Sequence, residues 1–197
     1  MDREHRDGVR LQYNAPVTLS FALLSLLAIA LGELTDGWTT QNLFCFFKSS
    51  PNDWLTWPRA VLHVLGSTDL TTCTGNLIVL LVVGPAAEER FGSVKVLFAV
   101  LLTAVAGALI MWYLFPKATI MGASGVLFMM MVLASFACAR SGEIPITLLL
   151  VLVLFLGSEV LRAVTGSAGL QELTHIAGGG VGILLGLLFN RRRRGEL

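Results

Sequence analysis

Charged residues are scarce in this sequence of 197 residues: they make up 14% of the chain, whereas hydrophobic residues make up 55%. A soluble domain typically has about 25% charged residues. One soluble domain of this length could not hide so much apolar surface behind a charged exterior. Disordered, collagen-like and coiled-coil chains need different compositions as well. The class that remains is a protein embedded in a membrane.

Other features that are weak or missing exclude several classes of function. The net charge is only +1, so there is no electrostatic case for nucleic acid as a partner. Three cysteines are an odd number and imply no disulfide framework. His5, His63 and His175 are too scattered for a zinc site, and there is no HExxH motif, so we expect no metal and no cofactor. No short apolar segment with a cleavage site opens the chain, so we expect no removable signal peptide.

Long apolar runs are what the sequence does have. Six of them approach the roughly 17–25 residues that a helix needs to cross a bilayer; they are Ala15–Gly32, Thr71–Ala87, Val96–Phe115, Gly122–Ala139, Ile144–Val164 and Thr174–Phe189. The runs are continuous rather than alternating, which favours helices over a barrel. We predict an all-α membrane protein: a six-helix bundle over residues 15–190, a preceding segment (1–14), a basic tail (191–197) and a long membrane-associated loop from Glu33 to Asp69.

The distribution of positive charge predicts the orientation. Six spans place both ends of the chain on one side, and ten of the fourteen Lys and Arg residues lie on that side: Arg3, Arg6, Arg10, Arg90, Lys95, Arg140 and Arg191 to Arg194. The positive-inside rule therefore predicts cytoplasmic termini. The four Trp residues all fall at or beyond the outer interface, as an aromatic belt would. The run of four arginines is read as a topology anchor, with a site for lipid headgroups as the alternative.

Three polar residues interrupt the apolar runs: Asn76, Ser124 and His175. Polar groups within a span are costly and need a partner or a purpose. The second, fourth and sixth spans run in the same direction, so the three residues are predicted at one depth, a little below the outer surface. Each alone has a plain structural explanation: an interhelical hydrogen bond for Asn76, a helix N-cap or packing position for Ser124, and a hydrogen-bonded place in a helix interface for His175.

Their neighbours also suit a chemical role. Ser124 stands within Gly122-Ala123-Ser124-Gly125, where the N–H groups of a helix N-terminus can stabilise an oxyanion. The Asn76 amide can donate to the same oxyanion. His175 is followed at helical spacing by glycines that allow close helix contact, namely Gly178, Gly182 and Gly186. Such a contact is what a Ser–His hydrogen bond requires. Phe128, one turn after Ser124, can stack on an imidazole, although such a residue is more often core.

These motifs, in this order along six spans, resemble the rhomboid intramembrane serine proteases. The most specific parts are the GxSG motif at Gly122–Gly125 and the His-Ile-Ala-Gly-x-x-x-Gly pattern from His175 to Gly182. Arg59 resembles the arginine of the family's Trp-Arg motif, and His63 the histidine at the outer end of the second helix. Glu88 and Arg90 resemble the cytoplasmic exit of that helix. We expect structural roles for these four residues, and helix-packing roles for Gly122, Gly125, Gly178 and Gly182.

The resemblance implies a rhomboid-like bundle with a water-filled cavity that opens outward, in a bacterial plasma membrane. It implies Ser124 as nucleophile, His175 as general base, an oxyanion hole of Asn76 and the Ser124 N–H, Phe128 stacked on the histidine, no cofactor, and transmembrane proteins as substrates. One departure is Thr72, which stands where the family usually has an oxyanion-binding histidine. Its hydroxyl is a candidate third donor, although a shorter one.

Two other functions stay open at this point. One is a catalytically weak or inactive rhomboid-like protein that binds transmembrane helices, to which only Thr72 points. The other is a small transporter or channel, which would favour internal repeats and an intramembrane ion site that the sequence does not display. The sequence names neither the substrate nor the oligomeric state.

Overall fold

The structure is a computed structural model that describes residues 15–137 and 170–194, together with 146, 150 and 153. Apart from residues 146, 150 and 153, the predicted fifth span, 144–164, lies outside the described part of the chain, as does the segment 1–14. In chain order, the elements are α1 (Pro16–Leu34), α2 (Trp38–Asn42), β1 (Phe46–Phe47), α3 (Thr56–Leu62), the 3₁₀ turn η1 (His63–Leu65), α4 (Leu70–Phe91), α5 (Ser93–Leu114), β2 (Thr119–Ile120), α6 (Ser124–Ala137) and α8 (Leu170–Arg194).

Long helices form where the sequence predicts spans. Among the described residues, α1, α4, α5 and the Leu173–Asn190 part of α8 are long and apolar enough to cross a membrane. Of the predicted fourth span, the described residues form a shorter apolar helix, α6, of 14 residues. Both α4 and α8 extend beyond their apolar cores, because the polar residues at their ends continue the helical hydrogen bonding. The described helices bear out five of the six predicted runs as helical.

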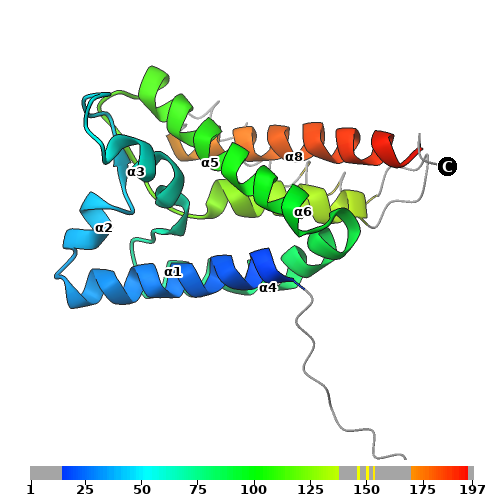
Figure 1. Ribbon diagram of the computed structural model, residues 1–197, viewed down its shortest axis with the longest axis horizontal. Coiled ribbons are helices and arrows are strands. Elements are labelled where there is room, and N and C mark those ends of the chain that lie inside the picture. Colours follow the sequence, from blue (N-terminus) through cyan, green and yellow to red (C-terminus); the bar gives the residue numbers. More distant parts are fainter. Residues whose placement is uncertain (1–14, 138–145, 147–149, 151–152, 154–169, 195–197) are drawn as a thin grey trace, which may run out of the picture.

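The helices pack side by side with α6 in the middle (Figure 1). It contacts α8 on one side and α4 on the other, while α1 packs on α4 and α5 crosses α8. The central core comes mainly from α1, α4, α5 and α6 and includes Leu80, Val126, Met129 and Leu133, each fully buried. The outward faces of the helices carry exposed Leu, Val, Ile and Phe side chains, which in lipid is the favourable arrangement.

The first loop, residues 33–69, folds at one end of the bundle, the left end in Figure 1. Its strand β1 pairs antiparallel with β2, so that Phe46 lies opposite Ile120. The N–H of Gly122 also donates to the carbonyl of His63 at 2.9 Å. Gly122 adopts φ +124°, which a residue with a side chain rarely does. The loop is thereby fastened to the segment that leads into α6.

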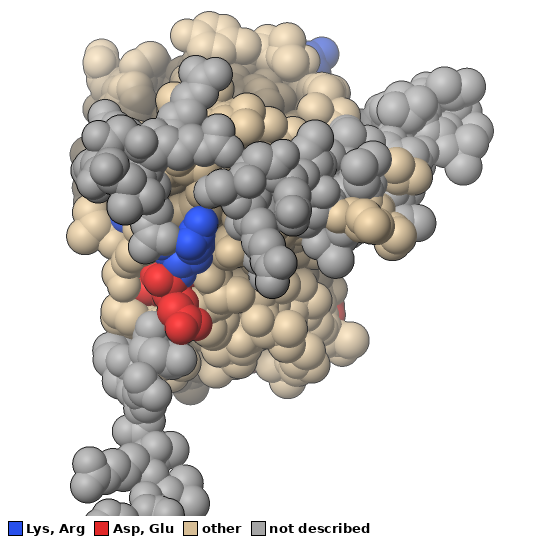
Figure 2. Space-filling view, turned by 90° about the vertical axis from the view of Figure 1, so that its right-hand side faces the viewer, with Lys and Arg blue, Asp and Glu red and all other residues tan. Residues whose placement is uncertain are grey.

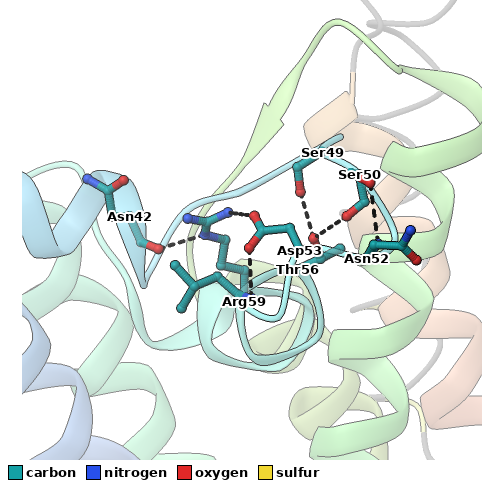
Figure 3. Close-up of polar contacts among 8 residues, drawn as sticks. Asn42, Ser49, Ser50, Asn52, Asp53, Thr56 and Arg59 are labelled. Atoms are coloured by element: carbon teal, nitrogen blue, oxygen red, sulfur yellow. Dashed lines mark hydrogen bonds and ion pairs between the residues drawn. The ribbon is translucent and has the colours of Figure 1, made fainter.

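Arg59 organises the interior of this loop (Figure 3). Its side chain is buried, and its Nε donates to the carbonyl of Asn42 at 2.6 Å, while Nη1 lies 3.3 Å from Oδ2 of Asp53. The guanidinium also lies over the ring of Phe47. The charge is thus paired and stacked although it is buried, so Arg59 joins α2, β1 and the turn before α3.

At the opposite end of the bundle, Glu88 of α4 caps the start of α1. Its two carboxylate oxygens accept from the N–H groups of Val17, at 3.0 Å, and Thr18, at 2.7 Å. These N–H groups belong to the first turn of α1, where no acceptor exists within the helix. A space-filling view of this end shows basic side chains directly beside acidic ones among the described residues (Figure 2).

Candidate functional site

A cavity of about 430 Å³ lies among η1, the outer parts of α4 and α5, β2 and the starts of α6 and α8. Side chains with a hydroxyl group dominate its polar lining, namely Ser67, Thr68, Thr72, Thr103, Thr119, Ser124 and Thr174. Asn76 and His63 complete the polar wall. Among the described lining residues there is no Asp, Glu, Lys or Arg, so the cavity is polar without carrying a charged side chain.

Ser124 lies in this cavity wall as the first residue of α6. The helical hydrogen bonding begins with the N–H of Leu127, which donates to the carbonyl of Ala123 at 2.8 Å. The N–H groups that come before it therefore have no acceptor within α6. Ser124, Gly125 and Val126 all line the cavity. The positive end of the α6 dipole is thus presented to whatever occupies the cavity, which suits an anion or a developing oxyanion.

His175 comes to the same place through the contact between α6 and α8. A Cβ added at Gly125 would lie 3.2 Å from the carbonyl oxygen of Thr174, and one added at Gly178 would run into the carbonyl oxygen of Gly125. The backbone of Gly125, the residue after Ser124, is therefore in direct contact with α8 on either side of His175. His175 is half-buried. It is not among the described residues that line the cavity, whereas its neighbour Thr174 is.

Phe128 is buried one helical turn below Ser124. Its ring edge occupies the space that a Cβ at Gly179 would need. Gly179 is one turn after His175, so Phe128 packs on the α8 turn that follows the histidine. One turn further on, Gly182 faces the carbonyl oxygen of Met129 and the side chain of Val132 in the same close manner. Gly178, Gly179 and Gly182 of α8 thus lie directly against α6.

Asn76 and Thr72 face the cavity from α4, one turn apart. The hydroxyl of Thr72 donates to Oδ2 of Asp69 at 2.7 Å, and the backbone N–H of Thr72 donates to Oδ1 at 2.7 Å. Thr68 donates its hydroxyl to Oδ2 as well, at 2.8 Å. These hydrogen bonds hold the pKa of Asp69 below its ordinary value, so the carboxylate is ionised at neutral pH. The hydroxyl hydrogen of Thr72, which the sequence indicates as a candidate donor to an oxyanion, therefore points to Asp69.

Sequence reasoning missed Asp69. The signal was present, because an Asp directly before an apolar run is typical of a helix N-cap. Its side chain caps α4 and at the same time fixes the hydroxyl of Thr72.

His63 lies in the cavity wall but not in α4, where the resemblance places it. It begins η1, and residues 66–69 separate it from α4, because Gly66 turns to extended backbone and Asp69 starts a new helix. The ring is buried, and its Nδ1 lies 3.1 Å from the carbonyl oxygen of Ala60. Burial lowers the pKa of His63 to about 4, so the ring is neutral. Since a carbonyl only accepts, Nδ1 carries the hydrogen.

The remaining sequence-predicted residues lie elsewhere. Arg59 lies in the first loop, and Glu88 and Arg90 lie at the far end of α4. Gly122 and Gly125, in contrast, line the cavity. Within the described part of the chain, no group of three or more His, Cys, Asp or Glu side chains could hold a metal ion.

Comparison of the sequence with models of known protein families identifies the family of this chain. The family model for the rhomboid domain matches residues 55–192. The chain belongs to the rhomboid family. Rhomboids are in general intramembrane serine proteases, and together with its apolar helices the match makes this chain an integral membrane protein. A search of curated protein sequences found no match. The rhomboid domain includes every element that contributes to the cavity, from η1 to the start of α8.

Proposed function

We propose that this rhomboid is an endopeptidase that cleaves transmembrane proteins within or near the membrane by a Ser124–His175 dyad. The observation that carries the proposal is the position of Ser124, at the N-terminus of α6 in a polar cavity, next to the direct backbone contact between Gly125 and the α8 turn that bears His175. Asn76 lines the same cavity. These positions support a nucleophile, a base and oxyanion donors that three helices contribute at one end of the bundle.

In the proposed mechanism, Oγ of Ser124 attacks the scissile carbonyl carbon while His175 takes the hydroxyl proton. The carbonyl oxygen becomes an oxyanion that accepts hydrogen bonds from the Ser124 N–H and the Asn76 side chain. As the C–N bond breaks, His175 gives its proton to the leaving amine. Water then attacks the acyl-enzyme with His175 as base, and the acid product leaves. Phe128 stacks on the imidazole and fixes its orientation.

The substrate reaches the cavity at the end of the bundle that carries the first loop. The start of α1 and the end of α8 both lie at the other end (Figure 1). Together with the charge distribution of the sequence, this supports cytoplasmic termini and a cavity that opens on the outer side of a bacterial plasma membrane.

Proteolysis in liposomes tests the function. We expect the purified protein to cleave a single-span reporter, and Ser124→Ala and His175→Ala each to abolish cleavage while the protein still inserts. Ser135→Ala is the matched control, because Ser135 is on the same helix, away from the cavity, and its hydroxyl donates to the carbonyl of Met131 at 2.9 Å. Full cleavage by Ser124→Ala would overturn the proposal.

A catalytically weak relative that binds transmembrane helices is the second candidate. The observation in its favour is that Thr72 replaces the family's histidine and gives its hydroxyl hydrogen to Asp69. A serine-reactive fluorophosphonate probe separates the two candidates. Labelling of the wild type but not of Ser124→Ala indicates an activated serine, whereas binding of the reporter without labelling favours the weak relative.

A further inference from the structure

The hydrogen bonds around Asp69 indicate how this chain can form an oxyanion hole without the histidine that the family usually has at the position of Thr72. The inference rests on the proposed function. We propose that Asp69 and Thr72 are positioning residues for the oxyanion hole. Asp69 takes the hydroxyl hydrogen of Thr72, and Oγ1 of Thr72 then accepts from the side-chain amide of Asn76 during the reaction. The second amide hydrogen of Asn76 is thereby aimed at the oxyanion.

The first step is the direction of the Thr72 hydroxyl. Both carboxylate oxygens of Asp69 accept from Thr72, one from the backbone and one from the side chain, at 2.7 Å each. A hydroxyl has one hydrogen and two lone pairs. A short bond from this hydrogen to an ionised carboxylate is about twice as strong as one between neutral groups. The hydrogen therefore stays with Asp69, and what Thr72 offers to its other neighbours is a lone pair.

The second step is the position of Asn76. It follows Thr72 by four residues on α4, so the two side chains lie on one helical face, and both line the cavity. Side chains on a helix lean toward its N-terminus, which brings the Asn76 amide over Thr72. An amide nitrogen carries two hydrogens. If one is donated to Oγ1 of Thr72, the rotation of the amide is fixed and the other is available to the cavity.

The third step is the role of charge. Asp69 is exposed at the start of α4, where water screens its negative charge from the cavity. The carboxylate therefore acts through the geometry of the chain Asp69–Thr72–Asn76 rather than through its field, and each hydrogen bond in such a chain polarises the next. Loss of an oxyanion donor costs about 10²–10³ in rate. Loss of its orientation alone costs less, and we expect about a tenfold loss in kcat.

The variant Asp69→Asn separates this arrangement from one in which Thr72 donates to the oxyanion directly. Asparagine keeps an oxygen to cap α4 but places an NH2 group opposite Oγ1 of Thr72, which turns that hydroxyl from acceptor to donor on its cavity side. If Thr72 donates to the oxyanion directly, its hydroxyl hydrogen would then be free to point into the cavity, and kcat would rise. A positioning Thr72 loses its acceptor role, and kcat falls about tenfold with KM unchanged.

The experiment measures kcat, KM and thermal unfolding of Asp69→Asn, Thr72→Val and Thr72→Ser in liposomes or micelles. We expect the tenfold loss for Asp69→Asn and Thr72→Val and near wild-type kcat for Thr72→Ser, which keeps the hydroxyl. In an Asn76→Ala background, Asp69→Asn is expected to cause no further loss, because the residue through which it acts is gone. Thr74→Val is the control, since that exposed hydroxyl donates to the carbonyl of Leu70.

Two results would overturn the inference: an unchanged or higher kcat for Asp69→Asn, or an equal loss with and without Asn76. If Asp69→Asn unfolds, Thr72→Val tests the same chain with the carboxylate cap intact. Ser124→Ala in the same assay keeps the two proposals apart. Cleavage by Ser124→Ala overturns the serine mechanism. If Ser124→Ala does not cleave the reporter but Asp69→Asn cleaves it with the wild-type kcat, only the positioning role is overturned.

Discussion

The chemistry of His63 is determined by its surroundings. The ring is buried in the cavity wall, near Gly107 of α5, and its own carbonyl accepts from Gly122 just before α6. Burial opposes the charged form, and the pKa falls from its ordinary value to about 4. A neutral ring at this position lets the first loop pack against the bundle without an unpaired charge.

We predict that His63 makes the fold acid-sensitive. Between pH 4 and about 6.5 the unfolded chain holds a proton on His63 that the native chain does not, so stability rises with pH in this window. On going from pH 7 to pH 4, His63 should lower the free energy of unfolding by about 3 kcal/mol. Denaturant unfolding in micelles at the two pH values measures it. His63→Gln has no such proton and should lose less stability; equal losses in both proteins would contradict the prediction.

At this scale, the sequence predicts which residues lie near one another better than it predicts how they are paired. Asn76, Ser124 and His175 stand out because polar groups are rare in apolar runs, and the structure gathers them around one end of α6. The partner of Thr72 is different. Spacing places Asp69 within reach, but only the folded structure shows that the hydroxyl hydrogen points to Asp69. The partners of Arg59 depend in the same way on how the first loop folds.

Among the elements, α6 and α8 make the closest contact. Gly178 lies directly against the carbonyl of Gly125, so any Cβ there forces the helices apart next to Ser124. We predict that Gly178→Ala lowers the unfolding temperature and abolishes most cleavage, because a small shift of the histidine relative to the serine costs about 10²-fold in rate. Thermal unfolding and reporter cleavage measure the two effects.

Gly180 supplies the matched control for Gly178→Ala. It is two residues further along α8, and a Cβ added there meets nothing within 4 Å. Gly180→Ala should keep full activity and gain about 0.5–1 kcal/mol of stability from the better helix propensity of alanine. Similar losses in both variants would show that the effect comes from the helix backbone and not from the contact with α6.

The pairing of α1 with α4 depends on Glu88. We predict that Glu88→Ala lowers the free energy of unfolding by about 3 kcal/mol, because two N–H groups of the first α1 turn lose a charged acceptor in a buried position. Glu88→Gln, which keeps one acceptor oxygen, should lose less. Glu89→Ala is the control, since Glu89 is exposed on the same turn. Steric-trapping or denaturant unfolding in bicelles measures these values, and equal losses at positions 88 and 89 would contradict the prediction.

The sequence predicts long helices well and short elements poorly. Apolar runs define α1, α4, α5 and α8, because lipid requires a helix wherever such a run crosses it. The short elements of the first loop were not predicted, because distant contacts stabilise them. β1 exists only through its pairing with β2, more than seventy residues later in the chain. Apart from residues 146, 150 and 153, the predicted fifth span lies outside the described residues, and it stays a prediction.

For the whole molecule, the first loop lies at one end of the bundle and the α4–α5 turn at the other, where charged side chains are exposed (Figures 1 and 2). The cavity is lined by η1 and β2, which belong to the end with the first loop. On the first loop, Trp38, Trp54 and Trp57 are 59%, 77% and 66% exposed. Large aromatic side chains are enriched where a membrane protein meets the lipid headgroups. This distribution fits the expectation that the loop lies partly in the outer leaflet.

We predict that lipid, not water, surrounds these tryptophans. In variants that keep Trp54 or Trp57 as the single tryptophan, with Phe at the other three positions, lipids brominated near the headgroup should quench the fluorescence strongly and aqueous iodide weakly. A Trp112-only variant is the comparison, because Trp112 is half-buried, stacks on Phe46 and lies under Lys48, so brominated lipids should quench it less. Strong iodide quenching of Trp54 and Trp57 would place the loop in water.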